Sequence, residues 1–385
     1  MPDAASEEAQ TVGPAPARVT LADVARIAGV SMATASRALG GGPRLPREDL
    51  RARVGEVAKR LRYIPNVAAQ AVARGQSNVL GLVVHDITDP YFTTIAHVVL
   101  EAAEAEGLMT VIADAHRDPE RELRYVAGFR GQRARAIIVA GSRVGEASSK
   151  ARLQHEIDLF IAQGGRLALI SQPELEANTV TVRNREAARS LALALCDHGY
   201  RDFAIFGAAA SFRTSTDRIE GFRTGLKSAG FVLDPSRIFR AEFSRDGGFA
   251  AATQMIDSGK LPECVFAVKD VMALGAMAAF RAAGLKVPQD VAVAGFDDVA
   301  TLRDVVPALT TVHIPVELVA TEAMEMVLRA EEAISLRRTV AGWVELREST
   351  PARTGEEVVQ MDGRAEMRSR RSTSAPHVAR PVTFR

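Results

Sequence analysis

Eight short apolar segments in residues 78–300 restrict the folds open to this chain more than any other feature. They read VLGLVV, LMTVIA, AIIVA, RLALI, TVTV, FAIFG, CVFAV and VAVAGF, with helical segments between most of them. Short apolar runs that alternate with helices are typical of parallel strands buried between two helical layers. The region is long for one such sheet, so we expect two similar α/β lobes, each a doubly wound parallel sheet.

The composition excludes several classes of protein. No apolar run reaches the roughly 20 residues that span a bilayer, and the N-terminal MPDAASEEAQTVGPAPA lacks the features of a secretory signal. Cys196 and Cys264 lie in apolar segments, which favours reduced, buried thiols in a cytoplasmic protein. Neither CxxC nor HxxxH occurs, so we expect no zinc site and no cofactor. GFRTGLKS only approximates a phosphate-binding loop, and the catalytic and nucleotide-binding motifs GxSxG and GxGxxG are absent. We therefore do not expect this protein to be an enzyme.

Charge is distributed unevenly along the chain. Between Arg18 and Gly75 there are 11 Lys and Arg but only 4 Asp and Glu, a net charge of +7, whereas the net charge of the whole chain is only +1. A basic module joined to a mildly acidic body suggests a head that binds a polyanion, although basic helices are often only solvated surfaces.

The basic head contains a helix-turn-helix pattern. Thr20 and Asp23 fit a capping box, Gly29 suits a sharp turn, and Ser31 is a good N-cap for a second helix. Small Ala25 and Ala35 allow the two helices to approach closely. A third helix follows with an apolar face at positions 50, 54, 57 and 61. The hydroxyl and guanidinium side chains that point outward on the second helix suit base and phosphate contacts in a DNA groove. A three-helix bundle without a ligand is the alternative.

A short Ala-rich segment follows the head. Pro65 ends the third helix, and Asn66 can cap a helix that runs to about Arg74. So short a helix is marginal in water and would form mainly when packed against a partner. A passive linker is the competing interpretation.

The ordered motifs VTLADVARIAGVSMATASRAL and RLRYIPNVAAQAVARGQSNVLGLVV resemble the head and hinge of the LacI/GalR family of transcriptional regulators. The resemblance covers roughly residues 18–351. It implies a DNA-binding head (18–64), a hinge helix or linker (65–77) and an effector-binding core like a periplasmic sugar-binding protein (78–351). The Ala-, Pro- and acid-rich arm (1–17) and the low-complexity tail (352–385) are expected from their composition to be disordered. Within the core the resemblance implies one lobe at about 78–177 and 311–340, and another at about 178–310 and 341–351.

The family pattern assigns DNA contacts to individual residues of the head and hinge. Reading positions in the major groove are Met32, Ala33 and Arg37, phosphate contacts are Thr20, Thr34, Ser36, Tyr63 and Asn66, and Arg47 lies nearby. Val72 stands where the family wedges a leucine into the minor groove, so the wedge position holds a smaller side chain. Leu39-Gly40 replaces the usual Leu-Asn.

The pattern also assigns an effector site beyond the carboxyl ends of the strands, where such sheets bind ligands. Tyr91 and Phe92 offer a stacking face, and Phe243 matches an aromatic residue that packs on a sugar ring. Arg218 and Asp297 match residues that bind effector hydroxyls, and we expect them to act from opposite lobes. Together this set suits a polyol.

Three departures from the family pattern change charge. Lys269 stands where Asn or a small polar residue is usual, Arg183 where Asp is usual, and Arg135-Ala136 where Asp-Gly is usual. Added cations near the cleft would favour a sugar acid or a phosphorylated sugar. The alternative, which we favour, is that Lys269 and Arg183 pair with Asp270 or Asp298, or point to solvent.

These observations predict a cytoplasmic, homodimeric repressor that binds operator DNA under the control of a sugar or sugar derivative, without a membrane partner. The alternative is a cytoplasmic sugar-binding or sensor protein whose head lacks operator specificity.

Overall fold

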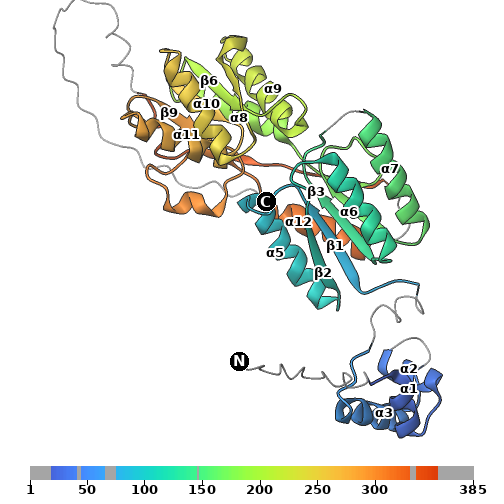
Figure 1. Ribbon diagram of the computed structural model, residues 1–385. Helices are drawn as coiled ribbons and strands as arrows, with labels where there is room; N and C mark the ends of the chain where they lie inside the picture. The colour runs from blue at the N-terminus through green and yellow to red at the C-terminus, as the bar shows by residue number, and fades with distance from the viewer. Residues whose placement is uncertain (1–18, 41–44, 66–74, 145–146, 330–334, 354–385) are drawn as a thin grey trace, which may run out of the picture.

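The computed structural model describes residues 19–40, 45–65, 75–144, 147–329 and 335–353 (Figure 1). They form a helical head and two α/β lobes, which confirms the predicted architecture. The arm, the segment 66–74 that was expected to form a hinge helix and most of the tail lie outside the described residues. In the part that is described, no helix is long and apolar enough to cross a membrane.

The head consists of three helices, α1 (Leu21–Ala28), α2 (Met32–Gly40) and α3 (Glu48–Arg60). Thr20 forms the predicted capping box with Asp23, and Gly29 takes a left-handed conformation, φ 65°, that ends α1. Val24, Ala35 and Val54 are fully buried in a small core shared by the three helices. The head therefore has a hydrophobic core of its own.

The first lobe is built on a six-stranded parallel sheet in the order β11-β5-β4-β3-β1-β2. Its strands are β1 (Val79–Val84), β2 (Met109–Asp114), β3 (Ala136–Ala140), β4 (Arg166–Ile170), β5 (Asn178–Val182) and β11 (Arg337–Val340). Helices α5 (Pro90–Ala105) and α12 (Val316–Leu328) cover one face, and α6 (Pro119–Gly131) and α7 (Ala147–Ala162) cover the other (Figure 1).

The central strands β1 and β3 are apolar throughout because both faces of the sheet are covered there. Leu82 and Ile138 pack into the core on one face, while their neighbours Val83 and Ile137 pack into the core on the other. β1 and β3 therefore bury successive side chains, which explains why the sequence shows continuous apolar runs there instead of alternation.

The second lobe repeats this plan around a four-stranded parallel sheet in the order β7-β6-β8-β9. Its strands are β6 (Phe203–Gly207), β7 (Ile238–Arg240), β8 (Cys264–Ala267) and β9 (Ala292–Ala294). Helices α8 (Asn184–Asp197) and α9 (Arg213–Ser228) pack together, as do α10 (Arg245–Asp257) and α11 (Asp270–Ala282). Short 3₁₀ helices span Pro235–Arg237 and Ala300–Asp304.

The chain passes between the lobes three times. Because β5 pairs with β4 in the first sheet, the first crossing follows Val182, later than the boundary near Asn178 that we expected. The other two crossings are the strands of an antiparallel ribbon, β10 (Thr311–His313) and β12 (Trp343–Glu345). Cys196 and Cys264 are buried free thiols.

Candidate functional site

The second helix of the head presents its first turn to solvent. The Ser31 side chain accepts a hydrogen bond from the Thr34 backbone N–H at 3.1 Å, which fixes the start of α2. Met32 is 59 % exposed, Ala33 is also exposed, and Thr34 is half-buried. Met32 is apolar yet exposed at the start of the second helix of a helix-turn-helix head, so it is placed to contact a partner.

Arg37 and Ser36 extend the same exposed surface along α2. The Arg37 Nε donates to the Ala33 carbonyl at 3.1 Å, so the guanidinium lies along its own helix. Within the described residues it forms no ion pair, which leaves its charge available to an anionic or base-edge acceptor.

The other predicted DNA-contact residues have varied surroundings. Thr20 is the exposed N-cap of α1, and Tyr63 is half-buried against the head's core. Arg47 is exposed and lies 3.4 Å from Asp49. Asn66 and Val72 lie outside the described residues.

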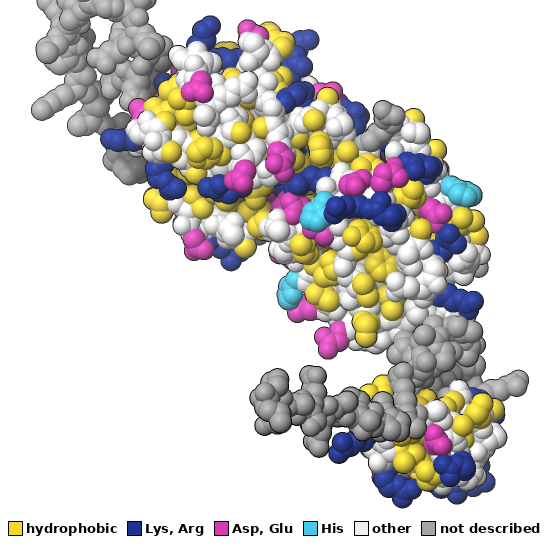
Figure 2. Space-filling view, viewed as in Figure 1, with side chains coloured by type: hydrophobic (Ala, Val, Ile, Leu, Met, Phe, Trp, Pro, Cys, Tyr) yellow, Lys and Arg dark blue, Asp and Glu magenta, His cyan; other side chains and the backbone are white. Residues whose placement is uncertain are grey.

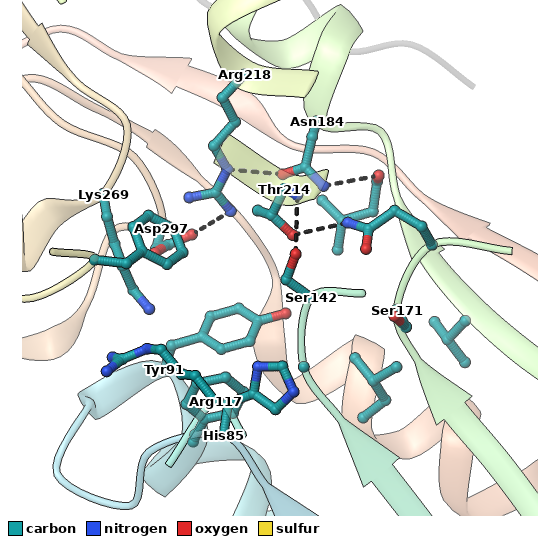
Figure 3. Close-up of a pocket in the computed structure, with 17 residues that line it drawn as sticks. His85, Tyr91, Arg117, Ser142, Ser171, Asn184, Thr214, Arg218, Lys269 and Asp297 are labelled. Atoms are coloured by element: carbon teal, nitrogen blue, oxygen red, sulfur yellow. Dashed lines mark hydrogen bonds and ion pairs between the residues drawn. The ribbon is translucent and has the colours of Figure 1, made fainter. Parts of the chain in front are cut away.

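A cavity lies between the two lobes at the carboxyl ends of their strands (Figure 3). The first lobe contributes His85, Tyr91, Phe92, Arg117, Gly141, Ser142, Ile170, Ser171, Gln172, Val180 and Val182, and the second contributes Asn184, Thr214, Arg218, Phe243, Lys269 and Asp297. Its volume is about 60 Å³, well below the roughly 150 Å³ of an apolar cavity that binds benzene. A sugar therefore requires the lobes to move apart or side chains to rearrange.

Arg218 lines this cavity and is held in place by three hydrogen bonds. Its Nε donates to Asn184 Oδ1 at 2.8 Å, Nη1 to the Val268 carbonyl at 2.7 Å, and Nη2 to Asp297 Oδ1 at 2.7 Å (Figure 3). The guanidinium also lies 3.8 Å from the centre of the Phe296 ring. Arg218 and Asp297 thus form a buried ion pair within the second lobe, which corrects our expectation that they act from opposite lobes.

Asp297 retains one free acceptor. Its second carboxylate oxygen, Oδ2, is buried and has no hydrogen-bond partner. Burial raises the pKa of Asp297, and the Arg218 guanidinium opposes that shift. The backbone φ of 119° is unfavourable for a residue with a Cβ. A buried acceptor without a donor is costly unless a ligand or water supplies one.

Lys269 joins the lobes across the cavity. Its ammonium pairs with Asp89, at the start of α5, and both side chains are almost fully buried. Aromatic rings surround it, with the centres of Phe243, Phe92 and Tyr91 at 4.8, 5.3 and 5.9 Å. The partner is therefore Asp89, not Asp270 or Asp298. Asp270 instead accepts from Thr311 Oγ1 at 2.6 Å.

Arg183 does not line the cavity. It precedes α8 with an exposed side chain, and its backbone N–H donates to the Val340 carbonyl at 3.0 Å. The next residue, Asn184, is buried and faces the cavity instead. A substitution one residue before a helix start thus changes the surface and not the binding site.

Sequence reasoning missed the polar side of the cavity. Ser142 Oγ accepts from the Thr214 backbone N–H at 3.0 Å, and Gln172 Nε2 donates to Thr214 Oγ1 at 2.7 Å, so these contacts link the lobes (Figure 3). Behind them, buried Arg143 binds Glu122 and Ser171. The position of Ser142 and Gln172, just after β3 and β4, was the signal that could have identified them.

Two further basic side chains at the cavity offer no unpaired positive charge to a ligand. Arg117 pairs with Asp86 at 2.6 Å. Burial lowers the pKa of His85 to about 4, so its imidazole is neutral at pH 7.

Comparisons with known proteins agree with both halves of this geometry. Residues 20–66 match the family model "Bacterial regulatory proteins, lacI family", and residues 192–350 match a periplasmic binding protein-like domain. The HTH-type transcriptional repressor CytR of Escherichia coli is 30% identical over 80% of this chain and 89% of its own length.

Two solved structures extend the comparison to three dimensions. A lac repressor dimer bound to operator and the anti-inducer ONPF superposes with a TM-score of 0.73 and 23% identity, covering 87% of this chain and all of that one. A complex of the transcriptional regulator CelR with cellobiose has a TM-score of 0.62 and 26% identity, covering 86% and 100% of the two chains.

Proposed function

This chain belongs to the LacI/GalR family of DNA-binding transcriptional regulators, and from that premise we propose that it is a repressor whose operator binding responds to an uncharged, polyhydroxylated molecule. The observation that carries the effector half of the proposal is Asp297 Oδ2, a buried acceptor without a donor inside the interlobe cavity. A ligand hydroxyl would supply the missing hydrogen.

The head is proposed to read DNA with the first turns of α2. The exposed Met32 and Ala33 suit apolar contacts with thymine methyl groups, and the unpaired Arg37 suits a guanine edge. Thr34 and Ser36 on α2, and Thr20 at the start of α1, carry hydroxyls that suit phosphate contacts.

Charge at the cavity favours a neutral sugar over a sugar acid or sugar phosphate. Arg218, Lys269 and Arg117 each already pair with a carboxylate of the chain, and His85 is neutral. An anionic ligand would have to separate one of these pairs and leave a buried carboxylate unpaired, which is strongly unfavourable. Tyr91, Phe92 and Phe243 supply an apolar wall against which a sugar ring can pack.

Regulation is proposed to act through the closure of the two lobes. The Lys269–Asp89 pair and the contacts of Thr214 with Ser142 and Gln172 join the lobes around the cavity. A ligand larger than the 60 Å³ cavity cannot enter without disturbing these contacts. Binding would therefore shift the equilibrium between lobe arrangements, and the first lobe follows the hinge segment directly in the chain.

We further propose a homodimer formed through α5 and β2. Leu100 on α5 and Met109, Val111 and Ile112 on the edge strand β2 are exposed, and Figure 2 shows apolar side chains gathered over these elements. An apolar edge strand is a liability unless another surface covers it. Sedimentation should give a dimer that Met109→Asp converts to monomer; an unchanged dimer would place the interface elsewhere.

The proposed site of action is the cytoplasm, where operator DNA is found, and the proposed role is regulatory and not enzymatic, since the curated relative is named as a transcriptional repressor.

The test is operator binding with and without an effector. An operator would be selected from a random duplex library with the full-length protein, and ligands would be screened by thermal shift among neutral sugars, sugar acids and sugar phosphates. We expect a neutral sugar to raise the melting temperature and to change operator affinity. Sugar binding by a chain that selects no DNA sequence would contradict the proposal and favour a cytoplasmic sensor.

A further inference from the structure

Three exposed arginines surround the point where the chain enters the core. Residues 75–78 lead into β1 at the amino edge of the first sheet, the edge opposite the effector cavity. Arg133 follows α6, Arg135 immediately precedes β3, and Arg166 begins β4. Because the amino ends of parallel strands share one edge, these residues form a single group, which we call the amino-edge arginines.

The charges of the amino-edge arginines are not compensated by the chain. Across the described residues, none of the three forms an ion pair, and only Arg166 makes a side-chain hydrogen bond, to the Leu328 carbonyl at 2.7 Å. Arg130, beside them, differs because it pairs with Glu156 at 2.9 Å. Arg135 also stands where the family pattern has an acid, so this edge has gained charge.

Arg133 occupies a backbone conformation that glycine would adopt more easily. The helices α5, α7, α8, α9, α10 and α11 all end with a left-handed glycine, namely Gly107, Gly164, Gly199, Gly230, Gly259 and Gly284. After α6, Arg133 holds the same conformation, with φ 54°. Ser77 fixes it there through two hydrogen bonds to the Arg133 carbonyl, at 2.8 Å from its N–H and 3.1 Å from its hydroxyl.

Backbone strain retained after α6, where six other helices of the core end on glycine, points to a role for the side chain. Among the described helix ends, the other left-handed arginine is Arg62, which follows α3 in the head with φ 50°. Arg62 lies three residues before Pro65, the last described residue of the head, and Arg133 contacts Ser77, near the first described residues of the core.

Two polar hollows lie beside the amino-edge arginines. One, of about 250 Å³, is lined by Arg130 and Arg133, and the other, of about 350 Å³, by Arg135 and Arg166. Gln76 borders both and is fixed by a 2.6 Å hydrogen bond from its amide to the Gly164 carbonyl. Guanidinium groups around a polar hollow match the geometry of phosphate oxygens.

We infer that the amino-edge arginines bind the phosphate backbone of the DNA on which the head sits. This inference rests on the proposed function, because it requires the head to hold a duplex. Nine residues separate Pro65 from Gly75, and the ten Cα–Cα steps between them limit the span to roughly 35 Å when fully extended and to about half that when helical. The core would then contribute contacts that carry no sequence information but add to affinity.

The test compares the salt dependence of DNA binding by full-length variants. The probes are the selected operator duplex and a random-sequence duplex. Arg133→Gly should fold at least as stably as the wild type, because glycine favours φ 54°. It should bind both duplexes about three- to tenfold more weakly, with a log K against log salt slope smaller by about 0.9 for the lost phosphate contact. Arg135→Ala should behave alike.

Matched variants separate this role from a general effect of charge. Arg133→Lys should retain most of the slope, and Arg223→Ala, which removes an exposed arginine on α9 in the second lobe, should leave it unchanged. Normal slopes in both Arg133→Gly and Arg135→Ala would overturn this inference alone. Failure of the wild-type protein to bind either duplex would overturn the proposed function as well.

Discussion

The reading helix and the effector cavity handle their charges in opposite ways. On α2, Arg37 is exposed and bonds only to its own helix backbone. In the cavity, Arg218 and Lys269 are buried and each is paired with a carboxylate. An exposed cation is solvated by water, so it costs little free energy to leave it unpaired, and it can bind an external anion. A buried cation must instead be paired with a carboxylate of the chain. The difference indicates an anionic partner for the head and an uncharged one for the cavity.

The largest effect is expected when the buried pair in the cavity is broken. Arg218→Ala or Asp297→Ala leaves one buried charge unpaired, which costs about 3–5 kcal/mol, and also removes a contact to the effector. Both variants should lose the effector response, measured by thermal shift and by operator binding with and without sugar. Operator binding should persist, because the head has a separate core.

A double variant sharpens this result. Arg218→Met with Asp297→Asn removes both charges and should regain stability but not the response. A response that survives both single substitutions would contradict the assignment of the cavity as the effector site.

The next effect concerns the pair that joins the lobes. Lys269→Met leaves Asp89 unpaired and should lower the free energy of unfolding by about 3 kcal/mol, at the low end for buried pairs because opening of the lobes can hydrate Asp89. Urea unfolding measures the loss, and adding Asp89→Asn should restore most of it.

The same double variant tests the charge of the effector. If the effector is neutral, Lys269→Met with Asp89→Asn should bind it nearly as well as the wild type. Loss of binding in the double variant, with stability restored, would show that the ammonium contacts an anionic ligand.

A smaller effect is expected at the reading helix. Arg37→Ala should cost about 1–3 kcal/mol on the selected operator and little on random DNA, as measured by fluorescence anisotropy, because a guanine edge carries sequence information. Equal losses on both duplexes would identify Arg37 as a phosphate contact.

The smallest effect is a dependence of stability on pH that His85 produces. Its pKa is about 4 in the folded chain and near 6.5 when unfolded, so the folded state binds fewer protons between these values. The stabilisation is complete above pH 6.5 and is lost as the pH falls towards 4, by on the order of 1–2 kcal/mol between pH 7 and pH 5.

Comparison with His85→Asn isolates this contribution. The comparison is necessary because burial raises the pKa of Asp270 to about 7, which makes stability fall as the pH rises through the same range. Equal pH profiles for the wild type and His85→Asn would show that His85 is not held neutral.

The sequence was most informative where one local pattern determines the structure. The strands at 79–84, 136–140, 166–170 and 203–207 coincide with the apolar runs, because a strand covered on both faces must be apolar throughout. The capping box at Thr20 and the turn at Gly29 depend only on neighbouring residues and were likewise predictable.

The sequence was least informative where partners come from distant segments. Asp89 and Lys269 are 180 residues apart, and nothing local to either identifies the other. β7, β10 and β12 have only three residues each, too few for a pattern. At Arg183 and Asn184, one residue of register decides which side chain faces solvent and which faces the cavity.

The claim that the head binds an anionic partner and the cavity an uncharged one is tested most directly by the salt dependence of binding at both sites of one protein. Operator affinity and the affinity of the sugar found by thermal shift would be titrated from low to physiological salt. Operator binding should weaken steeply, with a log–log slope of about −0.9 for each phosphate contacted, while sugar binding should stay nearly flat. A sugar affinity that falls as salt rises would reveal an anionic effector and contradict the account of a charge-balanced cavity.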